Sequence, residues 1–314
     1  MYVLKGCRSM FVLILPILFL GAIAVGGLLT IGATRLGNQE VHQGRAPRQD
    51  EFVPRNRPAP TPAETIQFVQ QNQIPLQQFI TGQISNHRIV MIGEPHAPHP
   101  FSSQLGTCLA NLNQEARQNL ILGVEITSAD GNDINNCLNR LGNNINTMTD
   151  NAILQELMLA PININMLNTL RLIIAARKAG IRVEYLGARL EGAGYQQREQ
   201  AMFNNLESLV SSNPNSRVIC YFGMNHPSLT PLILPNREEL LTTMGMMASQ
   251  QYGNQFNSIR VATDESGLAL DAAEPTNLVS RILSKLNANG PIAIPAGQFR
   301  DSDAGRHNHI ILAR

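Results

Sequence analysis

Short apolar runs that alternate with longer amphipathic stretches dominate the sequence from Ala63 onward. This alternation is typical of a parallel sheet whose strands are joined by crossover helices. Strands that are apolar on both sides, such as VICYFG, require a sheet that is covered on both faces. We therefore predict a three-layer α/β domain with a mostly parallel sheet over residues 63–314. The runs expected as strands are 88–93 (RIVMIG), 120–126 (LILGVEI), 181–187 (IRVEYLG), 217–223 (RVICYFG), 258–263 (SIRVAT) and 308–313 (NHIILA).

Helices are expected in the stretches between these runs. Gly180 follows a stretch that ends in Arg177 and Lys178, as expected for a helix terminated by glycine with cations in its last turn. The helices are predicted at 64–72, 101–118, 132–141, 150–158, 165–179, 195–212, 236–249 and 276–288.

The N-terminal segment has a different character. No charged residue lies between Arg8 and Arg35, and residues 10–34 are long and apolar enough to cross a hydrocarbon layer of about 30 Å. Lys5 and Arg8 precede this run, which favours an N-terminus inside the cytoplasm and a domain outside it. An uncleaved signal anchor and a cleaved signal peptide with a site near Gly21–Ala24 both remain open. The protein is then membrane-anchored through residues 10–34, or secreted or periplasmic after cleavage.

The next segment, residues 36–62, is polar and rich in proline. Such a segment has too little apolar surface to fold and tends to be extended. The predicted organisation is a membrane anchor or signal segment at 1–35, a disordered tether at 36–62 and the α/β domain at 63–314.

Composition excludes several functions. Twenty-four basic and 23 acidic residues give a net charge of +1, too little for nucleic acid binding through bulk electrostatics. The sequence contains no G-x-G-x-x-G, no P-loop, no C-x-x-C and no G-x-S-x-G. Dinucleotide, nucleotide, thiol-redox and serine-hydrolase functions therefore lack the motifs that they require.

Chemically active side chains follow four of the predicted strands. Glu94 and His96 follow the first, Glu125 ends the second, Arg189 follows the third and His226 follows the fourth. Ligands of open parallel sheets bind beyond the carboxyl ends of the strands, so these five residues are the candidate catalytic set. Each also has an ordinary alternative: helix-start carboxylates, satisfied core histidines or a solvated loop cation.

The order of these residues resembles a known superfamily. The motifs Gly93-Glu94-Pro95-His96 and Gly223-Met224-Asn225-His226 are both G-x-x-H, and Glu125 lies between them. This set is similar to that of the Tiki / erythromycin esterase / ChaN-like superfamily, over roughly residues 83–313. The resemblance implies an α/β fold with an acidic-histidine pocket, and ester hydrolysis, metal-dependent peptide cleavage or haem binding as the activity.

Two chemistries fit such a pocket. Glu94, His96, Glu125 and His226 could ligate Mn, Fe, Co or Zn, which would activate water. Without a metal, a histidine could act as general base while the second histidine or Arg189 stabilises the oxyanion. Both lead to hydrolysis of an ester or amide in a small molecule or peptide. The alternative is a haem- or iron-compound-binding protein without turnover, for which the ChaN-like branch implies a tyrosine ligand, here Tyr195.

A few further residues have weaker signals. His307 and His309, with Asp301 and Asp303 upstream, could form a second metal site. His99 could line the mouth of the pocket, and Arg198 could point into it. In an oxidising compartment Cys108 and Cys137 could form a disulfide, because each lies on a helix after one of two successive strands.

Overall fold

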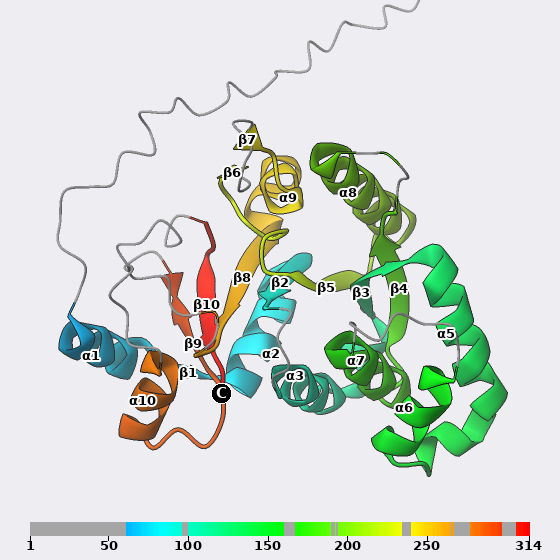
Figure 1. Ribbon diagram of the computed structural model, residues 1–314, viewed down its shortest axis with the longest axis horizontal. Coiled ribbons are helices and arrows are strands. Elements are labelled where there is room, and N and C mark those ends of the chain that lie inside the picture. Colours follow the sequence, from blue (N-terminus) through cyan, green and yellow to red (C-terminus); the bar gives the residue numbers. More distant parts are fainter. Residues whose placement is uncertain are drawn as a thin grey trace, which may run out of the picture. The chain divides into compact units, whose positions relative to one another are not determined.

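A computed structural model describes residues 61–95, 100–159, 167–189, 192, 194–233, 240–264, 266, 277–296 and 306–314 (Figure 1). Its strands are β1 (Ile74–Pro75), β2 (Ile89–Glu94), β3 (Leu120–Thr127), β4 (Arg182–Gly187), β5 (Arg217–Gly223), β6 (Leu232–Ile233), β7 (Leu240–Leu241), β8 (Phe256–Ala262), β9 (Ile292–Pro295) and β10 (His309–Leu312). Its α-helices are α1 (Pro62–Asn72), α2 (Leu76–Asn86), α3 (Phe101–Ala110), α4 (Gln114–Gln118), α5 (Ser128–Leu141), α6 (Asp150–Met158), α7 (Leu167–Lys178), α8 (Tyr195–Ser212), α9 (Met244–Tyr252) and α10 (Leu278–Lys285).

The fold is α/β, with a mostly parallel sheet. Among the described residues the main sheet has eight strands in the order β1-β9-β10-β8-β2-β5-β3-β4. All neighbours from β10 to β4 run parallel, whereas β9 is antiparallel to both β10 and β1 at one edge. The carboxyl ends of β2, β5, β3 and β4 therefore meet at one edge of the sheet.

Helices cover both faces of this sheet. On one face, strand residues such as Val90 and Tyr221 pack with side chains from α2, α3, α5, α6 and α7. On the other face, Met91, Cys220 and Phe222 pack with α8 and α9. A third cluster joins α1 and α10 to β9 and β10. In Figure 1, α8 and α9 lie on the opposite side of the strands from α3 and α7. These layers confirm that the strands are buried on both faces.

Threonines at strand and loop ends determine where several helices begin. Thr61 forms a capping box with Glu64 at the start of α1, and Thr127 accepts a hydrogen bond from the Asp130 N–H at the start of α5. Thr149 and Thr243 cap α6 and α9 in the same way. A threonine side chain at this position satisfies one of the amides that has no partner within the helix.

Each of the six predicted strands is present, within two residues at its start and one at its end. The hydrophobic pattern of the sequence did not predict α2 or the short strands β1, β6, β7 and β9. The predicted helix at 101–118 is wrong in its middle, because Asn113 caps a separate helix, α4. In the described part of 236–249, residues 240–241 form β7, and α9 begins only after the Thr243 cap.

The predicted anchor and tether, residues 1–35 and most of 36–62, lie outside the described residues. In the part of the chain that is described, no helix combines the length and the apolar character needed to cross a membrane. The predicted disulfide is wrong: Cys108 and Cys137 are both buried, free thiols. Their helices lie apart, because α3 packs against α7, whereas α5 packs against α6 and β4.

Candidate functional site

The site forms around β5, which lies between β2 and β3 (Figure 1). The last residue of β2, Glu94, is in register with the last residue of β5, Gly223. On the other side, Val124 of β3 is in register with Tyr221 of β5, which places Glu125 one residue farther toward the same edge. Both predicted carboxylates therefore lie at the carboxyl edge and flank the strand that leads to His226.

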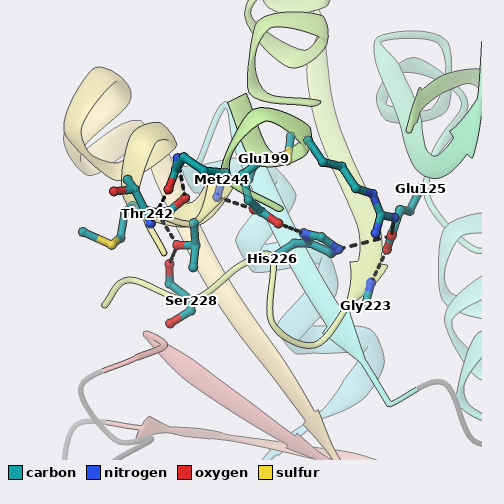
Figure 2. Close-up of polar contacts among 11 residues, drawn as sticks. Glu125, Glu199, Gly223, His226, Ser228, Thr242 and Met244 are labelled. Carbon is teal, nitrogen blue, oxygen red and sulfur yellow. Dashed lines mark hydrogen bonds and ion pairs between the residues drawn. The ribbon is translucent and has the colours of Figure 1, made fainter. Parts of the chain in front are cut away.

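His226 lies between two carboxylates. It follows β5 by three residues, and its side chain is only 11% exposed. Its Nε2 is 3.1 Å from Glu125 Oε1, and its Nδ1 is 2.6 Å from Glu199 Oε1 (Figure 2). Burial alone would lower the pKa of His226, but these two carboxylates raise it to about 9. The imidazole is therefore protonated at neutral pH.

Glu125 is the more heavily bonded of the two carboxylates. Its Oε2 accepts a hydrogen bond from the Gly223 N–H at 2.8 Å, and its Oε1 accepts one from Arg198 Nη2. Burial would raise the pKa of Glu125, but the contacts with His226, the Gly223 amide and Arg198 outweigh it and lower the pKa to about 2. Glu125 therefore stays ionised, and its carboxylate is a weak base.

Glu199 connects this group to two helices. It lies in the first turns of α8 and is 3% exposed, and its Oε2 accepts a hydrogen bond from the Met244 N–H at 2.8 Å. Met244 begins α9, and a helix N-terminus stabilises a negative charge. Nearby, Gln196 of α8 bonds both the amide (2.8 Å) and the carbonyl (3.2 Å) of Thr242. The starts of α8 and α9 are thus joined beside His226.

The charges of this group balance. Glu125 and Glu199 supply two negative charges, and His226 and Arg198 supply two positive ones. Three of the four side chains are 4–13% exposed, whereas that of Arg198 is 39% exposed. A buried charge is tolerated only when it is paired and hydrogen-bonded. Arg198 is therefore the most solvent-exposed member of the charged group.

Glu94 belongs to a different hydrogen-bond group. It is 5% exposed, and its Oε2 accepts hydrogen bonds from the Tyr221 hydroxyl at 2.5 Å and from Asn168 Nδ2 at 3.4 Å. Alternate residues of a strand point to opposite faces. Glu94 is in phase with Val90 and Ile92, which pack on the face covered by α7, and Asn168 comes from that helix.

The structure thus brings together part of the predicted set. Glu125 and His226 are in contact, while Glu94 binds Tyr221 and Asn168. Arg189 is exposed after β4, and Arg198 is the cation that contacts Glu125. His96 and His99 lie outside the described residues. Tyr195, the predicted haem ligand, is the first residue of α8 and is 50% exposed.

Glu199 was not singled out in the sequence, although a signal was present. In α8 it shares the apolar stripe of Met202, Phe203 and Leu206, at helical spacing. An acidic residue inside an apolar stripe indicates a buried carboxylate that needs a partner. Tyr221 carried no such signal because it lies in an apolar strand, and Asn168 carried none because it lies near the start of an amphipathic helix, where polar residues are ordinary.

The described part of the predicted site does not by itself form a metal site, and His96 lies outside it. Within the described ranges, no group of three or more His, Cys, Asp and Glu side chains is arranged to hold a metal ion. A metal ligand must be a neutral imidazole with a free lone pair. Both ring nitrogens of His226 face carboxylates, so a metal would have to displace one of the ring protons to bind this imidazole.

Of the predicted second metal site, the structure describes only the two histidines. His307 Nδ1 lies 2.9 Å from Ser258 Oγ, whereas His309 Nδ1 lies 3.3 Å from Asn257 Oδ1. The two imidazoles therefore bond different partners, and His309 also packs edge-on against Phe79. Asp301 and Asp303 lie outside the described residues.

No protein family matches the sequence, and no curated protein matches it. Among solved structures, a mutant of the erythromycin esterase EreC in its open conformation is similar, at 11% identity and a TM-score of 0.44, over 77% of this chain and 95% of that chain. A succinoglycan biosynthesis protein has 8% identity and a TM-score of 0.47, over 81% and 97%. A Bacillus cereus protein has 11% identity and a TM-score of 0.45, over 80% and 97%. We draw no functional conclusion from these likenesses.

Proposed function

We propose that this domain is a hydrolase of ester or amide bonds, with His226 at the centre of its catalytic site. The observation that carries the proposal is the buried imidazolium of His226, held between Glu125 and Glu199 at the carboxyl edge of the sheet. Burying three charged groups together costs free energy that apolar residues would not cost. Perturbed pKa values of this kind gather at functional sites.

The protonation state of His226 defines its proposed role. With a pKa of about 9, it holds a proton at neutral pH and cannot act as the general base of the resting enzyme. It acts as the general acid: as the tetrahedral intermediate collapses, the Nε2 proton passes to the leaving oxygen or nitrogen. Glu125 and Glu199 keep the ring oriented and stabilise its charge.

The remaining roles are assigned to Arg198 and to His96. Arg198, exposed on the outer side of Glu125, stabilises the oxyanion that forms when water attacks the carbonyl carbon. The proton that the attacking water loses is assigned to His96, on the basis of its place in the first G-x-x-H motif. Because the charged group includes no free imidazole lone pair, the proposed reaction routes no step through a metal.

The closing test is hydrolysis by the purified full chain, measured with nitrophenyl esters and with fluorogenic peptide amides. His226→Gln should lower kcat/KM by about 10²- to 10⁴-fold, the usual contribution of acid–base catalysis. His87→Gln is the matched control, since His87 caps α2 at the amino end of β2 and should leave activity unchanged. Hydrolysis that survives His226→Gln in folded protein would overturn the proposal.

Haem binding through Tyr195 is the alternative proposal. The same preparation, titrated with haem, should give no Soret shift if the domain is only a hydrolase. A shift in wild-type protein that Tyr195→Phe abolishes would favour the binding protein instead.

Membrane attachment through residues 10–34 is a separate proposal, which rests on the sequence alone. A reporter fused after Arg314 should be active only outside the cytoplasm. Reporter activity in the cytoplasm would contradict this topology.

A further inference from the structure

The loop that carries His226, residues 224–230, is fixed through its own backbone. Three consecutive carbonyl oxygens in this loop accept hydrogen bonds from three separate donors. The carbonyls of His226, Pro227 and Ser228 are bonded by the Gly245 N–H (2.7 Å), the Ser258 hydroxyl (2.6 Å) and the Thr243 hydroxyl, respectively. The next amide, Leu229 N–H, donates to the Arg306 carbonyl at 2.6 Å. The loop is therefore anchored to α9, to β8 and to the segment that leads into β10.

Close contacts with glycines fix the loop sterically as well. A Cβ atom at Gly93 would lie 2.8 Å from the Met224 Cα and 2.9 Å from the Pro227 Cγ. A Cβ atom at Gly245 would lie 2.2 Å from the Pro227 oxygen. Pro227 thus lies tightly between β2 and α9, and a small displacement of this residue would move His226.

Ser258 has a second partner on its far side. It is fully buried on β8, and its Oγ lies 2.9 Å from His307 Nδ1. Because the Ser258 proton is donated to the Pro227 carbonyl, Oγ accepts a hydrogen bond from His307. His307 therefore carries its proton on Nδ1. Burial and the neighbouring positive charges of Arg260 and Arg306 lower the pKa of His307 to about 3, so it is neutral at neutral pH.

A Ser–His pair invites comparison with a hydrolase nucleophile, but the geometry opposes that role. The Ser258 side chain has no exposed surface, and its proton is committed to a carbonyl. A base must accept the proton of the nucleophile, whereas His307 Nδ1 already donates to Ser258. The pair therefore has its effect on Pro227, the residue directly after His226.

We propose that Ser258 and His307 are positioning residues that hold the His226 loop in register with Glu125 and Glu199. This inference rests on the proposed function for its activity readout. The hydrogen bonds from His307 to Ser258 and from Ser258 to Pro227 connect the segment before β10 with the residue that directly follows His226. A shift of about 1 Å in a catalytic group can reduce the rate by about 10²-fold, so an anchor of this kind would affect turnover.

Variants of the full chain separate this role from simple stability. Ser258→Ala removes the donor to Pro227, and His307→Phe removes the donor to Ser258 while it keeps an aromatic ring. Both should lower kcat about tenfold or more, with KM changed less than about twofold. His307→Asn keeps an N–H near the Nδ1 position and should retain most of the activity. Ser102→Ala is the matched control, since Ser102 is also fully buried but its hydroxyl has no hydrogen-bond partner in the described structure.

The second readout does not depend on catalysis. The chain has seven histidines, so ¹⁵N-labelled imidazoles can be titrated individually by NMR. In Ser258→Ala the pKa of His226 should fall from about 9 toward its ordinary value, because the ring moves away from its carboxylates. In Ser102→Ala it should not move.

The outcomes distinguish the two proposals. If the wild-type chain hydrolyses nothing, the proposed function fails, and the His226 titration alone decides the positioning role. If Ser258→Ala keeps wild-type kcat and a wild-type His226 titration, the positioning role is wrong. A loss of activity that only matches the fraction of unfolded protein would equally overturn it.

Discussion

The two faces of the sheet at its carboxyl edge hold two buried carboxylate groups of different kinds. Toward α8 and α9, Glu125 shares a charged group with His226, Arg198 and Glu199. Toward α7, Glu94 is bonded by the neutral donors of Tyr221 and Asn168. Both carboxylates lie near the carboxyl end of a strand that borders β5, yet the partners of Glu125 are charged side chains, whereas Tyr221 and Asn168 are neutral donors.

The difference arises from alternation along the strands. β5 and the loop after it contact both groups. The Tyr221 hydroxyl donates to Glu94 on one face, whereas the Gly223 amide and His226 bind Glu125 on the other. A strand-end position therefore does not define the chemistry of a carboxylate. The face to which it points, and the helix that covers this face, decide whether it meets a cation or a hydroxyl.

The largest effect should come from removing one charge of the group beside α8. Glu199→Ala leaves the imidazolium of His226 with one carboxylate and removes the partner of the Met244 amide. Removing one partner of a buried ion pair costs about 3–5 kcal/mol in the free energy of unfolding. Urea unfolding measures this loss. Glu156→Ala, at an exposed position on α6, should change stability by no more than about 0.5 kcal/mol.

Stability should depend on pH in opposite ways through His226 and through the pair His307 and His309. The pKa of His226 is raised to about 9, so its stabilising contribution is complete below pH 6.5 and is lost as the pH rises through 9. The pKa values of His307 and His309 are lowered to about 3 and about 4, so these two oppose folding as the pH falls below 6.5. Maximum stability is expected near pH 6.5, with a decline of roughly 1–3 kcal/mol by pH 9.

Urea midpoints between pH 5 and pH 9.5 measure this profile, in a range where Glu125 stays ionised. His226→Gln should remove the alkaline decline, and His307→Asn should reduce the acidic one. A midpoint that stays level from pH 6.5 to pH 9 in the wild type would contradict the charged state of His226.

On the α7 face, the effect of one substitution should be smaller. Tyr221→Phe leaves the buried Glu94 without its 2.5 Å donor and should cost about 1–3 kcal/mol. Tyr185→Phe is the comparison, because the Tyr185 hydroxyl donates to the neutral Asn135 amide oxygen and should cost about 0.5–1.5 kcal/mol. Equal losses in thermal unfolding would mean that Glu94 gains nothing from its tyrosine beyond an ordinary hydrogen bond.

The smallest effect on stability is expected at Arg198. Its side chain is 39% exposed, so its ion pair with Glu125 is screened and Arg198→Gln should cost less than about 1 kcal/mol. In the proposed hydrolase the same change should lower kcat, whereas Arg140→Gln, at an exposed position on α5, should not. A large loss of stability without a change in kcat would mean that Arg198 has a structural role and not a catalytic one.

Particular residues show how far the sequence could predict this structure. The run RVICYFG is apolar on both faces and ends in glycine, and it coincides with β5 residue for residue. β1 and β9 were missed because they are short strands at one side of the sheet, and their pairing joins residues far apart in the chain. Neither segment has a local sequence pattern that predicts this pairing.

The sequence could predict which residues lie at the strand ends, but it could not predict which of them point to the same face of the sheet. The contact between Glu125 and His226 follows from parallel neighbours whose ends meet. The separation of Glu94 depends on register, which a single sequence does not contain. Glu199 comes from a helix whose docking brings it to His226, so its partner could not be read from its neighbours in the chain. The catalytic roles of Glu94, His96, Glu125, His226 and Arg189 stay predictions.

The protonation state of His226 is the most direct test of the whole account. In full-length protein with ¹⁵N-labelled histidine, both ring nitrogens of His226 should show the chemical shifts of an imidazolium at pH 7.5, with a transition near pH 9. That result would place a fixed positive charge between Glu125 and Glu199. A neutral imidazole at pH 7.5, with a transition at or below pH 6.5, would contradict it.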